Sequence, residues 1–158
     1  MATHTFFDSF LQAQYEGGTA QTISSMPVDF DGDTIKFGII TSTVTPDTDE
    51  TSTHLHWDDL SGNEVSGTNY TAGGITVTSI TVTREGSGII MIDGVNITIL
   101  QDAGGFSNGR HGILYKSTGT ASTSPLISAV DFGADKGNVS NDLLLSFNAN
   151  GIYRFTKA

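Results

Sequence analysis

From residue 20 onward, apolar residues recur at every second position in short segments that are separated by Gly, Asn and Asp. The segment DTIKFGIITS places Ile35, Phe37 and Ile39 on one side of an extended chain, and VNITIL alternates in the same way. This period is typical of β-strands, because successive side chains of a strand point to opposite faces of a sheet. The alternation therefore restricts the chain to an all-β fold.

About eight such segments follow one another, with turn residues between them at regular spacing, and this arrangement is typical of a sandwich or barrel. They are DTIKFGIITS, GITVTSITVT, GIIMI, VNITIL, GILYKS, LISAVDF, LLLSFNA and IYRFTK. The alternation shifts at Ser79, which predicts a β-bulge. Asp93-Gly94 predicts a hairpin between GIIMI and VNITIL, and residues 148–151 join the last two strands. The expected fold is a single antiparallel domain over residues 1–158.

Residues 6–15 differ from the rest because their apolar positions fit a helix. Phe7, Phe10 and Leu11, with Gln14, follow the i, i+3, i+4, i+7 spacing of one helical face. Thr3 or Thr5 is expected to cap the start of this helix, and Gly17-Gly18 to end it. Residues 1–18 are thus predicted as an N-terminal helical segment, and residues 19–158 as the β-sandwich.

The large apolar side chains of this short helix need a cover. They either pack on the sheet of their own domain, as apolar stripes usually do, or dock on a neighbouring subunit. Trp57 lies in a surface loop over residues 43–62, which we expect to contain one helical turn near Trp57–Leu60. The candidate partner-contact residues are Phe6, Phe7, Phe10, Leu11 and Trp57.

Charge and composition exclude several classes of partner. Seven Lys and Arg against 17 Asp and Glu give a net charge of −10, which repels nucleic acids and anionic membranes. The chain has no Cys, so disulfides and thiolate metal sites are excluded. No apolar run approaches the length of a membrane span, and the N-terminus is not expected to be a signal peptide.

The glycine-rich stretch NEVSGTNYTAGG at residues 63–74 is not predicted to bind phosphate. It lacks the Lys of a P-loop and leads into a strand, whereas a phosphate loop precedes a helix. We interpret it as a structured entry into the strand that begins at Ile75, with Val65 and Tyr70 anchored in the core. Gly73-Gly74 would let the backbone turn.

Two groups of residues have partial metal-ligand spacing. Asp29, Asp31 and Asp33 alternate as in a calcium loop, but the glycine and the bidentate acid of that motif are missing. His54 and His56 share one side of an extended segment, near the acids at 58 and 59, yet a closed zinc site needs four protein ligands. We therefore predict no cofactor and no metal.

The segment 105–109, GFSNG, matches the G-x-S-x-G pattern of a nucleophile elbow. That motif requires a strand before the serine and a helix after it, and neither pattern flanks this segment. We predict no catalytic residue and no enzymatic activity. A small hydrolase that uses the His and Asp side chains of residues 54–59 is the least favoured alternative.

Three stretches together resemble a family of small tailed-phage virion proteins. They are DTIKFGIITSTVTPDTD at 33–49, HLHWDDLSGNEVSGTNYTAGG at 54–74 and ILYKSTGTASTSPLISAVDFGADKG at 113–137. The stretch at 63–74 is the most specific of these matches. The chain departs from the family pattern at Thr45-Pro46, and at Asn69, where glycine is common.

The resemblance implies a structural component of the particle, assembled in the bacterial host cytoplasm. We expect a capsid decoration (cement) protein that reinforces the shell of the major capsid protein, with other virion proteins or further copies of the chain as possible partners. The alternative is a neck, tail or fibre-base protein that contacts carbohydrate through Trp57.

Overall fold

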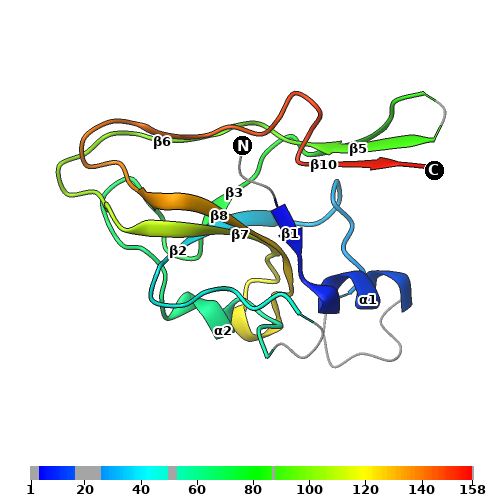
Figure 1. Ribbon diagram of the computed structural model, residues 1–158, viewed down its shortest axis with the longest axis horizontal. Helices are drawn as coiled ribbons and strands as arrows, with labels where there is room; N and C mark the ends of the chain where they lie inside the picture. Colours follow the sequence, from blue (N-terminus) through cyan, green and yellow to red (C-terminus); the bar gives the residue numbers. More distant parts are fainter. Residues whose placement is uncertain (1–3, 17–25, 50–52, 87, 158) are drawn as a thin grey trace.

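The computed structural model describes residues 4–16, 26–49, 53–86 and 88–157 of the chain (Figure 1). Strands make up 39% of the described residues and helices 11%, which confirms the predicted all-β class. The strands are β1 (His4–Phe6), β2 (Ile35–Thr41), β3 (Ile75–Thr76), β4 (Thr81–Arg84), β5 (Ile89–Asp93), β6 (Ile97–Ile99), β7 (Gly109–Lys116), β8 (Leu126–Lys136), β9 (Leu143–Leu145) and β10 (Tyr153–Thr156). The helices are α1 (Asp8–Glu16), α2 (Asp58–Ser61) and a 3-10 turn at Ala121–Thr123.

These strands form three antiparallel sheets. The largest has the order β1-β8-β7-β2-β3, and the two smaller sheets have the orders β10-β5-β4 and β6-β9. The five-stranded sheet lies in the middle of the molecule, with both smaller sheets on one side and α1 and α2 on the other (Figure 1). The central strands β2, β7 and β8 are therefore buried on both faces over much of their length.

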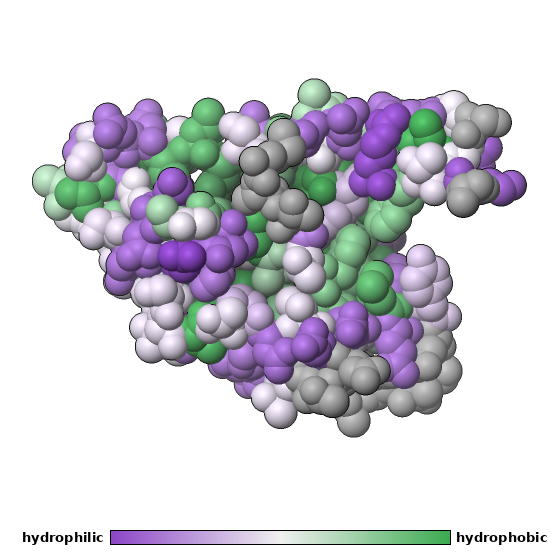
Figure 2. Space-filling model, viewed as in Figure 1, coloured by the Kyte–Doolittle hydropathy of each residue, from purple (hydrophilic) through white to green (hydrophobic). Residues whose placement is uncertain are grey.

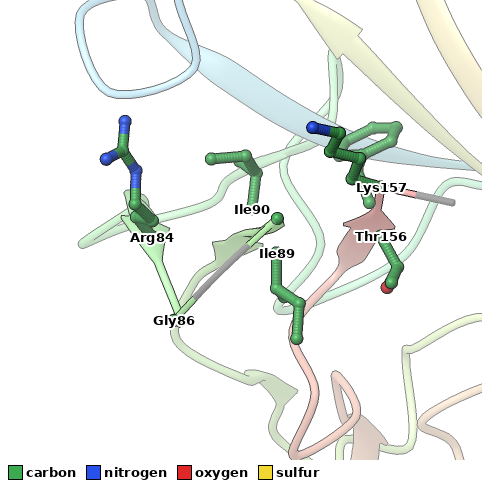
Figure 3. Close-up of a pocket in the computed structure, with 8 residues that line it drawn as sticks. Arg84, Gly86, Ile89, Ile90, Thr156 and Lys157 are labelled. Carbon is green, nitrogen blue, oxygen red and sulfur yellow. The ribbon is translucent and has the colours of Figure 1, made fainter.

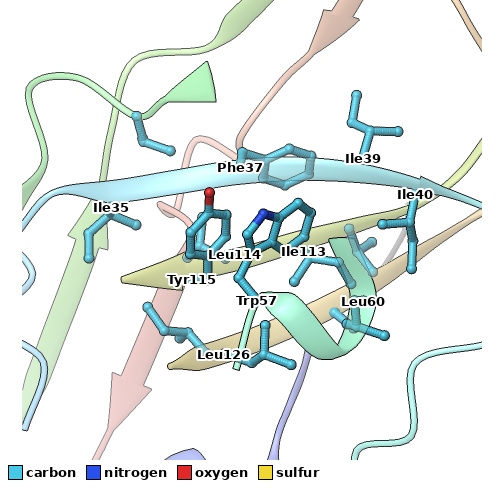
Figure 4. Close-up of a cluster of buried hydrophobic side chains, with 14 of the residues drawn as sticks. Ile35, Phe37, Ile39, Ile40, Trp57, Leu60, Ile113, Leu114, Tyr115 and Leu126 are labelled. Carbon is cyan, nitrogen blue, oxygen red and sulfur yellow. The ribbon is translucent and has the colours of Figure 1, made fainter. Parts of the chain in front are cut away.

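Trp57 belongs to the core between α2 and the five-stranded sheet. Its ring stacks on that of Tyr115 at 4.7 Å with an interplanar angle of 2°, and only 4% of its surface is exposed (Figure 4). Gly38 makes room for it, because a Cβ atom at Gly38 would lie 2.4 Å from Cη2 of Trp57. The predicted helical turn at this point is confirmed as α2, but Trp57 offers no surface for a partner or a sugar.

The N-terminal helix begins at Asp8, two residues later than predicted, because Phe6 completes strand β1. β1 pairs with β8, with Thr5 opposite Ala129, so Thr5 is a strand residue and not a helix cap. Thr3 and Gly17-Gly18, predicted at the helix ends, lie outside the described residues. Phe7 and Phe10 are 0% and 3% exposed, which shows that α1 packs on its own domain.

The predicted bulge at Ser79 and the predicted hairpin turn at Asp93-Gly94 are both points at which the chain changes sheets. At Ser79, where φ is +52°, the chain leaves the sheet that contains β3 and enters the one that contains β4. The predicted hairpin at Asp93-Gly94 is wrong, because β5 pairs with β4 and β10, whereas β6 pairs with β9. As a result, the β10-β5-β4 sheet extends beyond the central sheet as an arm that overhangs α1 (Figure 1).

Asn138 holds three loops together at the other end of the molecule. Its side chain is fully buried, and its Oδ1 accepts the backbone N–H of Phe106 at 3.0 Å. Its Nδ2 donates to the carbonyls of Thr68 at 3.0 Å and Leu100 at 2.8 Å. Every polar atom of this amide is thus paired inside the protein, as a buried polar side chain requires.

Candidate functional site

An apolar groove lies between α1 and the overhanging β10-β5-β4 sheet. It has a volume of about 440 Å³. In the space-filling view it opens as a hollow below the projecting arm, with green apolar walls (Figure 2). Its apolar lining comes from β1, α1, β5, β10 and the loop before β2, and includes Phe6, Leu11, Tyr15, Phe30, Ile90 and Phe155.

The strand register explains why the upper wall of the groove is apolar. Tyr153 pairs with Ile92 and Phe155 pairs with Ile90, and directly opposed residues of antiparallel strands share one face. These four side chains therefore form a continuous apolar row on the underside of the arm. On each strand the two side chains are two residues apart, which is the alternation that the sequence shows for a β-strand.

Phe6 is the centre of the aromatic wall. Its ring centroid lies 4.5 Å from that of Tyr153, 5.6 Å from that of Phe10 and 6.2 Å from that of Phe155. Phe30 closes the cluster by an edge contact with Tyr153 at 5.9 Å. Such aromatic pairs add stability beyond the area they bury, so the groove has a rigid wall formed before any partner binds.

The rim of the groove remains exposed in the isolated chain. Tyr15 is 83% exposed, Phe155 41% and Ile90 38%. Of the predicted contact residues, Phe6, Phe10 and Leu11 line the groove, with Phe10 at its buried base, whereas Phe7 and Trp57 are buried in the core. Tyr15 and Phe155 were not predicted, although Tyr15 is four residues after Leu11 on α1. Phe155 was already apparent as an alternating residue of the last strand.

A buried hydrogen-bonded chain joins β1, β8 and β10 behind this groove. His4 Nδ1 lies 3.0 Å from the Ser128 hydroxyl oxygen, which is also hydrogen-bonded to the Tyr153 hydroxyl. Burial raises the pKa of Tyr153 and lowers the pKa of His4. Ser128 is 0% exposed, so a substrate cannot reach its hydroxyl. The chain of bonds is suited to fixing the N-terminal strand, not to nucleophilic catalysis.

We expect the free energy of unfolding to fall as the pH is lowered from 7.5 to 5.5. An unfolded histidine takes up a proton near pH 6.5, whereas burial lowers the pKa of folded His4 and His111. The unfolded state therefore binds more protons below pH 6.5, and each histidine contributes a slope of at most about 1.4 kcal/mol per pH unit. Asp131 has a folded pKa of about 2, so it is deprotonated in both states between pH 5.5 and 7.5 and adds nothing to this slope.

Urea unfolding at a series of pH values measures this slope. The variant His4→Gln keeps a hydrogen-bonding side chain next to Ser128 but does not titrate, so its slope should be smaller than that of the unchanged protein. An equal slope in both proteins would show that His4 is not held in its neutral form by the fold.

The stretch at residues 63–74 is organised around one carboxylate. Glu64 accepts the backbone N–H groups of Gly73 and Gly74 and the hydroxyl of Tyr70, each at 2.7–2.9 Å. Gly73 and Gly74 have φ values of +81° and +73°, which glycine adopts without strain. Donors that could have bound a phosphate are thus occupied by the protein's own carboxylate. Val65 and Tyr70 are buried, which confirms that they anchor the stretch.

Two further contacts fix this stretch to the central sheet. The Tyr115 hydroxyl donates to the carbonyl of Gly73, and the Tyr70 hydroxyl accepts the N–H of Ile39 at 2.9 Å. Burial, reinforced by the charge of Glu64, raises the pKa of both tyrosines. Asn69 has a φ of +66°, a conformation that asparagine tolerates better than most residues other than glycine.

His54 and His56, which the sequence suggested as a possible pair of metal ligands, have different partners in the structure. Nδ1 of His54 accepts the backbone N–H of Asp47, whereas His56 lies with Asp58 and Asp59, one ligand atom of each falling within 4.8 Å of the others. One oxygen of Asp59 already accepts the N–H groups of residues 55 and 56. We therefore interpret this cluster as the cap of a turn, and its two carboxylates are exposed.

The acids at residues 29–33 also serve a turn. Asp33 accepts the backbone N–H of Asp29 at 2.8 Å and forms an ion pair with Lys116 at 2.8 Å. The segment 105–109 leads into strand β7, and not into the helix that a nucleophile elbow needs. Neither segment has the geometry of the site that its sequence pattern suggested.

Comparisons with family models, with curated proteins and with solved structures find no match to this chain. Neither of the described helices is long and apolar enough to cross a membrane. The candidate site therefore depends on its own geometry, which is that of a rigid apolar groove with an exposed aromatic rim.

Proposed function

We propose that this chain is a non-enzymatic structural protein of a tailed-phage virion, and that it acts as a decoration (cement) protein on the capsid shell. The apolar groove between α1 and the arm carries this proposal. Exposed apolar surface that is contiguous and rimmed by polar residues marks protein interaction sites. Tyr15 and Phe155 are of the residue class that dominates binding energy at such sites.

A decoration protein reinforces a shell by burying surface against it, and it needs no reaction chemistry. The rigid β-scaffold and the preformed aromatic wall suit that role, because a preorganised surface loses little conformational freedom when a partner binds. The net charge of −10 would keep the protein away from the packaged genome. The resemblance of the stretches at 33–49, 54–74 and 113–137 to small virion proteins supports the same assignment.

Quantitative mass spectrometry of purified particles from the phage that encodes this chain tests the proposal. We expect a copy number on the order of that of the major capsid protein, because cement proteins occupy repeated sites over the whole shell. A dozen or fewer copies would place the chain at the neck or tail. Absence of the chain from the particle would contradict a virion role altogether.

A further inference from the structure

Among the residues that the structure describes, no strand pairs with the outer edge of β4, which is the second unpartnered surface of the arm. β4 is the last strand in the order β10-β5-β4, and all four of its residues are exposed. Its sequence, TVTR, has high β-propensity and no proline. Proteins commonly protect such edges with proline, bulges or inward-pointing charges, because an open edge pairs readily with another chain.

The register shows which backbone groups of β4 are free. The N–H of Glu85 donates to the carbonyl of Ile89, so that pair is of the hydrogen-bonded type. Hydrogen-bonded pairs alternate with non-hydrogen-bonded pairs along an antiparallel ladder. The N–H and C=O groups of Val82 and Arg84, which lie opposite Ile92 and Ile90, therefore point away from β5. They provide two donors and two acceptors for an added strand.

The same end of the arm carries two cations on an apolar face. Arg84, Ile90 and Lys157 extend to one side of the sheet, whereas Ile89 and Thr156 extend to the other (Figure 3). The cations and Ile90 line a hollow of about 520 Å³. Within the described part of the chain, neither Arg84 nor Lys157 has an ion-pair partner.

This local charge is opposite to that of the whole chain. Arg84, Arg154 and Lys157 lie on this sheet and are three of only seven Lys and Arg residues in a protein of net charge −10. Arg154, on the other face, is paired with Glu85, so the two unpaired cations are those on the apolar face. Complementary charges across an interface select the partner and disfavour others.

We propose that the β4 edge binds an extended segment of another protein, which adds to the arm as a further strand. The segment has apolar side chains at alternate positions, one of which lies beside Val82, and an acidic residue beside Arg84, where Lys157 adds positive charge to the same face. A second copy of this chain fits less well, because it presents the same cations and the same net charge. This binding mode holds whether or not the partner belongs to a virion.

Strand addition relies on main-chain hydrogen bonds for affinity and on side-chain pockets for selectivity. The probe is a short synthetic peptide that alternates valine and threonine and ends in two glutamates, with a matched peptide that ends in two lysines. Titration of each into the isotope-labelled full chain is followed by NMR. We expect the acidic peptide to shift the amide signals of Val82 and Arg84 and to slow their hydrogen exchange, and to bind at least about 10-fold more tightly than the basic peptide.

Two variants separate the contributions of charge and backbone. The double variant Arg84→Glu with Lys157→Glu should reverse the preference, so that the basic peptide binds more tightly. The variant Val82→Pro removes an outward N–H without removing a bond to β5, and it should abolish binding of both peptides while the fold is retained, because proline is tolerated on edge strands.

Three results would overturn the proposal. One is a lack of amide shifts at β4 with either peptide, and another is equal affinity for both peptides before and after the charge reversal. The third is protection of the β4 amides that rises with the concentration of the protein alone, which would show that a second copy occupies the edge. None of these results depends on the copy number in particles, so the virion assignment is tested separately.

Discussion

Replacement of Asn138 by leucine is expected to lower the free energy of unfolding by about 2–6 kcal/mol. Leucine leaves the N–H of Phe106 and the carbonyl of Thr68 unpaired in the interior, at about 1–3 kcal/mol for each group. The carbonyl of Leu100 keeps the bond that it accepts from Nδ2 of Asn69 at 3.2 Å. The site offers no space for a compensating shift, because a Cβ atom at the adjacent Gly105 would already lie 2.2 Å from Oδ1 of Asn138. A loss of this size is a large part of the stability of a typical domain.

Urea unfolding measured by circular dichroism gives the difference. The matched control is Asn141→Leu, because Asn141 is exposed three residues further along the same loop. Its free energy of unfolding should stay within about 0.5 kcal/mol of the unchanged protein, as is usual for surface substitutions. Equal stabilities of the two leucine variants would contradict the role of Asn138 in joining the three loops.

Replacement of the two most exposed aromatic residues of the groove is expected to abolish binding to the particle and to leave the fold intact. In the double variant Tyr15→Ser with Phe155→Thr, binding should weaken at least about 100-fold, because the loss of a buried aromatic anchor costs about 2 kcal/mol or more. The fold should be retained, although Phe155 loses its ring contact with Phe6, because Tyr15 and Phe155 are 83% and 41% exposed in the isolated chain. Sedimentation of the labelled protein with particles that lack it measures the binding.

The other end of the molecule supplies a matched control for this variant. Leu100 and Leu144 are 60% and 57% exposed and lie at the β6-β9 sheet, away from the groove. The double variant Leu100→Ser with Leu144→Ser should bind particles as tightly as the unchanged protein. Loss of binding in this control, with binding retained in the groove variant, would place the interface at the β6-β9 end instead.

The sequence predicted the elements well because the strands obey a local rule. Alternation located β2, β7 and β8, and the turn at α2 was apparent from its composition. The helical period at Phe7 and Phe10 correctly favoured packing on the domain itself. Local patterns of this kind depend only on which face of an element is buried, so a single sequence contains them.

The pairing of the strands could not be predicted in the same way. Asp93-Gly94 has the composition of a hairpin turn, but β5 and β6 join different sheets, and no local signal distinguishes the two outcomes. The groove exists only because β5 and β10 pair and extend over α1. Tyr15 and Phe155 therefore come together on the rim only through tertiary structure, and no pattern in the sequence indicates that they share a site.

A cryo-EM map of the purified particle would test the central proposal most directly. We predict density for this chain on the outer surface of the shell, at repeated positions, with Tyr15 and Phe155 covered by a subunit of the major capsid protein. A map in which the chain is absent, or in which it is bound through another surface while the groove between α1 and the arm stays open to solvent, would contradict the proposal.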